Sequence, residues 1–135
     1  VLFRSGTAKH VVDKLRKDGK KVGVVKLSVF RPFPSTIIRE ICQNIPVVGV
    51  FDRSSGLGSD GGPVWNEVRS SIMSEKTQVF PFVGGLGGRD VTIETITRIY
   101  EELLKEKPSY DGSQSWIDLG INPFGIRVME LENEN

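Results

Sequence analysis

Cysteine and histidine are nearly missing from this 135-residue chain, which contains one of each, Cys42 and His10. Disulfide frameworks, zinc ribbons and cysteine-bound iron–sulfur clusters all need several such residues, so the chain by itself excludes these three kinds of site. A serine-based catalytic triad also needs a base, and His10 stands among basic residues on a predicted surface helix. We therefore expect neither residue to be catalytic, and we interpret Cys42 as a small buried hydrophobic residue.

Long apolar runs are also missing. A membrane-spanning helix needs about 20 apolar residues, and the longest apolar run here, residues 46–51, is far shorter. Together with the single cysteine, this absence leads us to expect a cytoplasmic protein with no membrane partner.

The net charge is small, +1, but its two signs are unevenly placed. Residues 1–67 contain 11 basic and 6 acidic side chains, whereas residues 68–135 contain 7 and 11. Most of the basic excess lies between residues 9 and 26, on a predicted helix and the turn after it. This pattern fits a phosphate-binding face and, more simply, an ordinary solvated helix face. No aromatic residue stands among these lysines to stack on bases, so we expect no nucleic-acid partner.

Helices and strands alternate along the predicted chain. Apolar spacing and turn residues predict four helices, over residues 7–18, 35–43, about 63–72 and 92–107, and three strands, over residues 21–30, 47–51 and 77–83. The strands are nearly all apolar, as in parallel strands that are covered on both faces. We therefore predict an α/β fold, a three-layer α/β/α sandwich with a mainly parallel sheet.

The predicted domain covers residues 1–108. Residues 109–135 read as an irregular C-terminal extension that docks on this domain or trails from it, with Trp116, Ile117 and Leu119 as the docking candidates. The acidic tail from Glu130 is expected to fray.

Glycine, in contrast, is abundant, and many of the 15 glycines fall in two clusters. The first cluster, from Gly56 to Gly61, fits G-x-G-x-x-G between a strand and a helix, where backbone N–H groups can bind a pyrophosphate. Two features argue against a dinucleotide site. The strand before the cluster is a middle strand instead of the first strand of a βαβ pair, and the next strand ends in glycines instead of the acidic residue that would hold a ribose. Two interpretations remain: a stand-alone nucleotide- or phosphate-binding module, and a tight turn whose glycines permit close packing.

Two pairs of oppositely charged neighbours follow predicted strands, Asp52 with Arg53 and Arg89 with Asp90. Ligands bind at this edge of open α/β sheets, but charge pairs also brace loops there. We interpret both pairs as loop braces or partner contacts, because the residues alone contain no complete catalytic set.

Four motifs occur in a specific order and spacing. They are Lys-Leu-Ser-Val-Phe-Arg-Pro-Phe-Pro (26–34), Val-Phe-Asp-Arg-Ser (50–54), Gly-Gly-Pro-Val-Trp-Asn-Glu-Val-Arg (61–69) and Gly-Leu-Gly-Gly-Arg-Asp (85–90). The series resembles the α-subunit segment of the pyruvate and related 2-oxoacid:ferredoxin oxidoreductases, a domain whose fold is similar to the C-terminal domain of transketolase. The likeness runs from about Gly6 to the end of the long helix, and the last motif favours the pyruvate enzyme over its relatives.

The resemblance implies that the complete enzyme converts a 2-oxoacid and coenzyme A to acyl-CoA, CO2 and reduced ferredoxin, using thiamine diphosphate, magnesium and iron–sulfur clusters. This chain has neither the Gly-Asp-Gly run with a downstream Asn that would hold the magnesium nor the cysteines of a cluster. We therefore expect no catalytic, cofactor-binding or metal-binding residue here. The expected role is structural: the segment joins and orients other domains or subunits, and ferredoxin meets only the complete enzyme.

In this interpretation the glycines let another backbone come close, and the arginines supply charged contacts. The expected interface residues are Arg31, Pro32, Phe33, Pro34, Asp52, Arg53, Gly85, Gly87, Gly88, Arg89 and Asp90. The family carries an apolar strand before the first helix, where this chain has only residues 1–5, so we expect a piece of a longer subunit with a partial first strand. An incomplete sheet edge invites pairing, which predicts a homodimer of the isolated chain. The preferred 2-oxoacid, the direction of flux and the subunit arrangement stay open.

Overall fold

The computed structural model describes residues 5–105 and 115–116. Its elements, in chain order, are α1 (Ser5–Lys17), α2 (Ser35–Cys42), β1 (Val47–Asp52), α3 (Pro63–Ser71), β2 (Gln78–Val83), the short 3-10 turn η1 (Leu86–Gly88), α4 (Ile93–Leu103) and β3 (Ser115–Trp116). The four predicted helices and two of the three predicted strands are therefore confirmed, with shifts of a few residues at their ends. None of the described helices has the length and apolar character that a membrane span requires.

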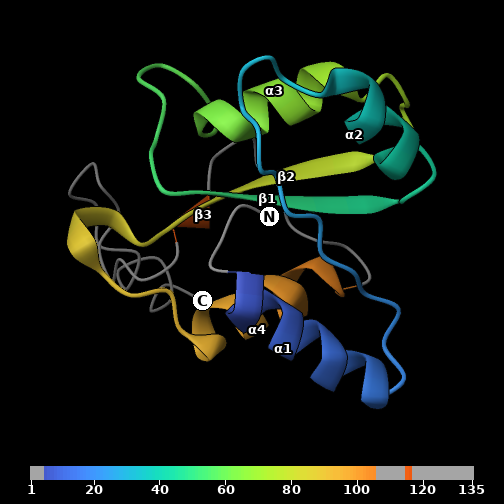
Figure 1. Ribbon diagram of the computed structural model, residues 1–135, viewed down its shortest axis with the longest axis vertical. Helices are drawn as coiled ribbons and strands as arrows, with labels where there is room; N and C mark the ends of the chain where they lie inside the picture. The colour runs from blue at the N-terminus through green and yellow to red at the C-terminus, as the bar shows by residue number, and fades with distance from the viewer. Residues whose placement is uncertain (1–4, 106–114, 117–135) are drawn as a thin grey trace, which may run out of the picture.

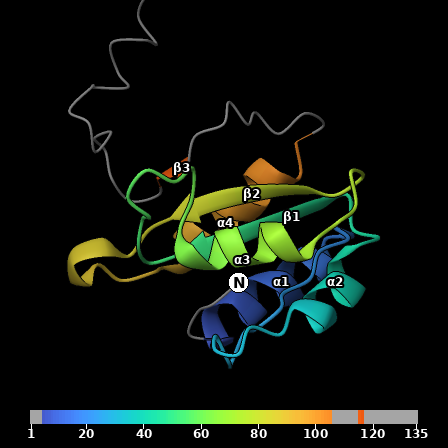
Figure 2. The ribbon, with the colours of Figure 1, turned by 90° about the horizontal axis from the view of Figure 1, so that it is seen from above.

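The described strands form one parallel sheet in the order β1-β2-β3. Val47 of β1 stands opposite Gln78 of β2, and Asp52 stands opposite Val83, so both strands end at the same edge. Helices α1 and α4 cover one face of the sheet, and α2 and α3 cover the other (Figure 1 and Figure 2). The predicted three-layer α/β/α sandwich with a mainly parallel sheet is confirmed.

Each face of the sheet has its own core, because successive side chains of a strand point to opposite faces. The phenylalanine core lies between the sheet and the α1/α4 layer and contains Ala8, Val11, Val12, Phe51, Phe80, Phe82, Ile96, Ile99 and Tyr100. The tryptophan core lies under α2 and α3 and contains Ile38, Cys42, Val50, Trp65 and Val68. Both sets are buried, so the apolar strands are covered on both sides, as their composition predicts.

The strand predicted over residues 21–30 is wrong. These residues form no strand but a crossing segment (residues 20–30) that passes from the α1/α4 layer to the α2/α3 layer (Figure 1). Val22 and Val24 pack against the phenylalanine core, whereas Val25 and Leu27 pack against the tryptophan core. A chain that crosses the sheet edge does not run beside β1 far enough to form a ladder. Its apolar residues pack into the two cores one after the other, whereas those of a strand would alternate between the two faces of the sheet.

Side chains of the α1/α4 layer hold the start of the crossing segment. The guanidinium Nε of Arg16 donates a hydrogen bond to the carbonyl of Val22 at 2.7 Å, and the hydroxyl of Tyr100 donates to the carbonyl of Gly23 at 2.8 Å. Such bonds to backbone carbonyls replace the ladder bonds that a strand would have supplied.

The C-terminal prediction is partly corrected. Ser115 and Trp116 form a short strand that pairs with Phe82 and Val83, so the extension is not wholly irregular and adds a strand to the sheet. Ile117, Leu119, the acidic tail and the predicted boundary at residue 108 lie outside the described residues.

The two isoleucines at the start of α4 give a matched test of the phenylalanine core. Ile96 is 2% exposed in that core, whereas Ile93 is 48% exposed. We expect Ile96→Ala to lower the free energy of unfolding by about 2–5 kcal/mol, through lost burial and a residual cavity. Ile93→Ala should change it by less than about 1 kcal/mol. Urea denaturation followed by circular dichroism measures both, and equal losses would contradict this assignment of the core.

Candidate functional site

The candidate site lies where β1 and β2 end at the same edge of the sheet. Asp52 closes β1, and the backbone N–H of Gly84, just after β2, donates to its carbonyl at 3.1 Å. The loop from β1 to α3 and the loop from β2 to α4 both begin here, and they carry the two glycine clusters (Figure 1). The structure thus brings together both glycine clusters and both charged pairs that the sequence singles out.

The carboxylate of Asp52 is engaged by the start of α3. Its Oδ2 accepts a hydrogen bond from the backbone N–H of Trp65 at 3.0 Å, and its Oδ1 accepts one from Val64 at 3.2 Å. Pro63, the first residue of α3, has no N–H to offer. Asp52 therefore satisfies backbone donors at this helix N-terminus and places a negative charge at the positive end of the helix dipole.

Asp52, one of the expected interface residues, is only 4% exposed in this chain. Burial raises the pKa of its carboxyl group, and the hydrogen bonds from Trp65 and Val64 lower it in part. Because both oxygens already accept backbone N–H bonds, this carboxylate is a structural brace. The sequence-based choice between a brace and a partner contact is decided in favour of the brace at this residue.

Gly61, which ends the first glycine cluster, and the adjacent Gly62 pack inward. A Cβ added at Gly61 would lie 2.4 Å from the ring of Trp65 and 2.9 Å from Pro81, and one at Gly62 would lie 2.3 Å from Cγ of Asp52. Gly62 has an ordinary extended backbone, so it is a glycine because of this crowding. These two glycines admit neighbours of the same chain instead of a cofactor or a second backbone.

A phosphate site on this loop is not favoured by the geometry. Such a site uses the N–H groups at the following helix N-terminus, and here Asp52 accepts those of Val64 and Trp65. The buried negative charge of Asp52 would also repel a phosphate. Across the loop, Nδ2 of Asn66 donates to Oγ of Ser59 at 2.9 Å, a bond between the loop and α3 that braces the turn.

The tip of the second glycine cluster faces outward. Gly85, Gly87 and Gly88 all have a positive φ, the region that glycine adopts without strain. Gly87 and Gly88 are exposed, and a Cβ added at either would meet nothing within 4 Å. Arg89 and Asp90, which follow, are also exposed. This loop therefore presents bare backbone beside two charged side chains.

Arg53 ties the two loops together. Its Nη2 donates to the carbonyl of Gly85 at 3.1 Å. A Cβ added at Gly85 would lie 3.0 Å from Val91, so the base of the second loop is crowded while its tip is open. Asp52 and Arg53 thus brace different neighbours and form no ion pair with each other within the described residues.

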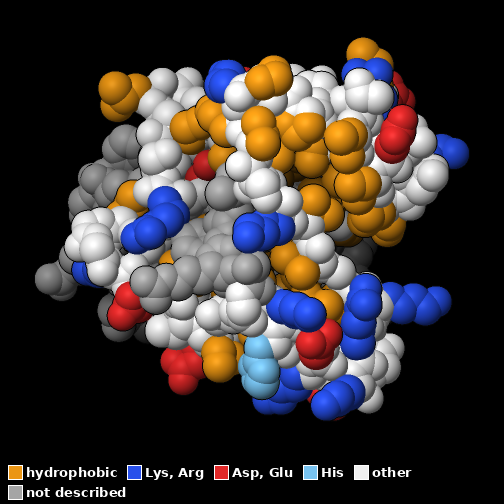
Figure 3. Space-filling model, viewed as in Figure 1, with side chains coloured by type: hydrophobic (Ala, Val, Ile, Leu, Met, Phe, Trp, Pro, Cys, Tyr) orange, Lys and Arg blue, Asp and Glu red, His pale blue; other side chains and the backbone are white. Residues whose placement is uncertain are grey.

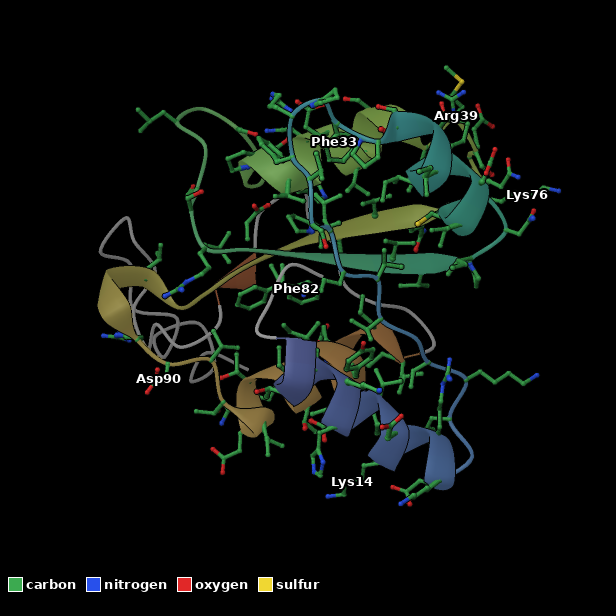
Figure 4. All side chains as sticks on the ribbon, in the orientation of Figure 1. Lys14, Phe33, Arg39, Lys76, Phe82 and Asp90 are labelled. Atoms are coloured by element: carbon green, nitrogen blue, oxygen red, sulfur yellow. The ribbon has the colours of Figure 1, made fainter. Side chains whose placement is uncertain are left out.

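The Arg31-to-Pro34 motif lies apart from this edge. Arg31 forms an ion pair with Glu67 of α3 at 2.7 Å, and its guanidinium lies 4.2 Å from the ring centre of Phe30. Phe33 packs against the tryptophan core, on the side of the sheet away from Asp90 (Figure 4). The expected interface residues therefore divide into two separate surfaces.

Sequence reasoning missed two groups that support this site. The indole N–H of Trp65 donates to the carbonyl of Val79 at 3.1 Å, which ties α3 to β2. The hydroxyl of Thr77 donates to the carbonyl of Cys42 at 3.2 Å. The sequence did contain a signal for the bond between the end of β1 and the start of α3. Gly62-Pro63 comes immediately before a helix and ten residues after Asp52, which ends an apolar strand. No group of three or more His, Cys, Asp and Glu among the described residues could hold a metal ion.

Removal of the Asp52 carboxylate tests the brace. We expect Asp52→Ala to lower the free energy of unfolding by about 1–3 kcal/mol or more, because buried N–H groups at the start of α3 lose their acceptor. Asp90→Ala, at an exposed carboxylate, is the control and should change it by less than about 0.5 kcal/mol. Chemical denaturation at neutral pH measures both variants. Similar small effects would contradict a bracing role for Asp52.

The raised pKa of Asp52 predicts a pH dependence of stability. The folded chain holds this proton more tightly than the unfolded chain, so Asp52 contributes most stability below the ordinary carboxyl range. That contribution is lost as pH rises through this range toward the folded-state pKa. Asp52→Asn does not titrate there. The stability of the native chain minus that of Asp52→Asn should therefore fall as the pH rises above about 4, the ordinary range of an aspartate carboxyl group, measured by urea unfolding. A rise would contradict the sign of the shift.

Residues 3–96 match the family described as pyruvate:ferredoxin oxidoreductase core domain II. The chain is 40% identical over 103 residues to the pyruvate synthase subunit PorA of Methanosarcina barkeri, a match that covers 74% of this chain and 25% of that protein. It is 35% identical over 114 residues to PorA of Methanocaldococcus jannaschii, covering 84% and 28%. The ketoisovalerate oxidoreductase subunit VorA of Pyrococcus furiosus is 35% identical over 123 residues, covering 84% and 30%.

The chain thus spans between 25% and 30% of the length of these relatives. The resemblance inferred from the four ordered motifs is confirmed, because the family match covers most of the chain. This chain belongs to the pyruvate:ferredoxin oxidoreductase core domain II family.

Proposed function

We propose that the chain is a structural and assembly domain of a 2-oxoacid:ferredoxin oxidoreductase, with pyruvate as the favoured 2-oxoacid. The observation that carries this proposal concerns the carboxyl edge of the sheet, where α/β enzymes bind ligands. In this chain that edge is filled by groups of the chain itself. The carboxylate of Asp52 occupies the α3 N-terminus, and Gly61 and Gly62 are packed against side chains of the same chain. The names of the relatives, pyruvate synthase and ketoisovalerate oxidoreductase subunits, support the choice of enzyme class.

The buried titratable groups support a role without catalysis. Burial raises the pKa of Tyr100 to about 12, and its hydroxyl is used to hold Gly23. Burial also raises the pKa of the Cys42 thiol, which disfavours the thiolate that a nucleophile needs. Each buried titratable group that the structure describes thus has packing or bracing as its role.

The cofactors of the family do not fit the described residues. A diphosphate would meet the Asp52 carboxylate at the α3 N-terminus, and a magnesium ion or a cluster would find no set of three ligands among the residues described. In this proposal, thiamine diphosphate, magnesium, iron–sulfur clusters and coenzyme A bind elsewhere in the complete enzyme. Conversion of 2-oxoacid and coenzyme A to acyl-CoA, CO2 and reduced ferredoxin also belongs to the complete enzyme, in the cytoplasm.

The partner contact is proposed at the outward glycine loop, residues 85–90. Bare backbone at Gly87 and Gly88 lets another chain come close, and exposed Arg89 and Asp90 supply charged contacts. The partners are other domains or subunits of the same oxidoreductase, and ferredoxin meets the assembled enzyme. A homodimer of the isolated chain stays a prediction, and sedimentation at high concentration measures it.

Arg89→Ala in the complete subunit tests the contact. We expect about tenfold weaker association with the other subunits, the loss typical of a contributing interface arginine. Lys76→Ala is the control, because Lys76 is exposed and lies at the other end of the molecule from Asp90 (Figure 4). Co-purification and analytical ultracentrifugation of the co-expressed subunits measure assembly.

Unchanged assembly with Arg89→Ala would remove Arg89 from the interface. Micromolar binding of a dinucleotide to the chain, measured by calorimetry, would instead support the nucleotide-binding alternative at Gly56 to Gly61.

A further inference from the structure

A strongly basic surface lies on the outer side of α1 and continues into the turn after it. Residues 9–21 contain six Lys or Arg and two Asp, and all eight of these side chains are exposed. Figure 3 shows Lys and Arg side chains gathered over α1, with few acidic ones among them. We call the six cations the basic face: Lys9, Lys14, Arg16, Lys17, Lys20 and Lys21.

The charge of the basic face is not balanced by described carboxylates. The ion pairs among the described residues are Arg31 with Glu67 and Lys105 with Glu102, and neither involves the basic face. Lys14 and Lys17 stand three residues apart on α1, a spacing at which like charges repel. A partner of opposite charge relieves this repulsion, so the basic face favours an acidic surface.

The stability of α1 itself explains only part of this pattern. Lys14, Arg16 and Lys17 lie in the last turn of the helix, where cations offset the negative end of the helix dipole. Lys9 lies in the first half of α1, where the dipole gives a cation no such advantage, and Lys20 and Lys21 come after the helix ends. The excess of positive charge therefore extends beyond what the helix needs.

The surroundings of α1 select the class of partner. Side chains on the outer side of one helix diverge, as Lys14 does by pointing away from the sheet (Figure 4), so they do not surround a small anion. The apolar side of α1, with Ala8, Val11 and Val12, is buried in the phenylalanine core and has nothing to insert into a membrane. Residues 9–21 contain no Phe, Trp or Tyr to stack on bases. A second copy of the chain would bring the same positive surface close.

We propose that the basic face binds an acidic surface of a partner polypeptide. Lys9, Lys14 and Lys17 contact it from α1, and Lys20 and Lys21 extend the contact past the end of the helix. Complementary charges of this kind mainly speed association and fix the orientation of the two proteins. The identification of the partner as another domain or subunit of the oxidoreductase rests on the proposed function. Its acidic character rests on the basic face alone.

The first test uses the 135-residue chain and a fluorescent peptide of about ten glutamates. We expect fluorescence anisotropy to show binding at about 50 mM NaCl that weakens about tenfold or more at about 500 mM NaCl, because salt screens exposed charges. Lys14→Glu should weaken binding about fivefold or more, whereas Lys14→Arg should leave it unchanged.

Lys76→Glu is the matched control for Lys14→Glu. Lys76 is exposed and lies far from Lys14 in Figure 4, and its substitution changes the net charge by the same amount. We expect it to weaken the glutamate peptide less than about twofold. Because Lys14 and Lys76 are both exposed, thermal unfolding followed by circular dichroism should show intact folds.

The second test places the same variants in the complete subunit, co-expressed with the other subunits. Lys14→Glu should weaken association about fivefold and reduce its dependence on salt, whereas Lys76→Glu should change neither. Analytical ultracentrifugation at two salt concentrations measures both effects.

Equal weakening of the glutamate peptide by Lys14→Glu and Lys76→Glu would overturn the proposal, because binding would then follow net charge alone. Tighter binding of an oligothymidine strand would overturn it in favour of a nucleic acid. Displacement of the peptide by inorganic phosphate beyond the effect of NaCl at equal ionic strength would overturn it in favour of a small anion. Self-association that Lys14→Glu abolishes would identify the partner as a second copy and overturn it as well.

The Arg89 experiment separates this proposal from the proposed function. Assembly that Arg89→Ala weakens and Lys14→Glu leaves unchanged would reject the basic face as a subunit contact. Assembly that only Lys14→Glu weakens would reject the outward glycine loop instead. Site-specific binding of the glutamate peptide together with assembly that neither variant changes would reject the assembly role and support an acidic partner outside the oxidoreductase.

Discussion

The buried carboxylate of Asp52 is the constraint on which the carboxyl edge depends. It joins the end of β1 to the first N–H groups of α3, and it forces a glycine at position 62, where any side chain would collide with it. Burial of one carboxylate is costly, and hydrogen bonds from two backbone donors offset part of that cost. The result is an edge that is filled by its own chain, in a position where other α/β folds hold a ligand.

The contact surface that we propose at residues 85–90 follows from this closure. With the inner part of the edge filled, the tip of the second glycine cluster is left facing outward, and the bond from Arg53 to Gly85 joins the base of its loop to the end of β1. This surface suits contact with other polypeptides better than chemistry on a small molecule, in agreement with the assembly role that we propose.

Local patterns predicted much of the fold but not the path of every segment. The helical spacing of apolar residues in α1 and α4 and the apolar runs of β1 and β2 were sufficient to predict these elements. A helix of this kind buries one apolar stripe and a covered strand buries both of its faces, so the pattern is visible within each element. Residues 21–30 have the same valine-rich composition as a strand, yet they divide their valines between two cores. Composition is identical for a chain that runs along a sheet and one that crosses its edge, so only packing separates them.

The sequence by itself determined the α/β class, the family and the exclusion of sites that need several cysteines or histidines within these 135 residues, since these depend on residue types, spacing and order. Tertiary structure decided what each glycine and carboxylate does. Gly61 and Gly88 are alike in the chain, but one packs against Trp65 and the other has nothing near it. Asp52 and Asp90 both follow strands, but only Asp52 meets a helix N-terminus. The physical reason is that burial and hydrogen-bond partners come from distant parts of the chain, which adjacent residues do not specify.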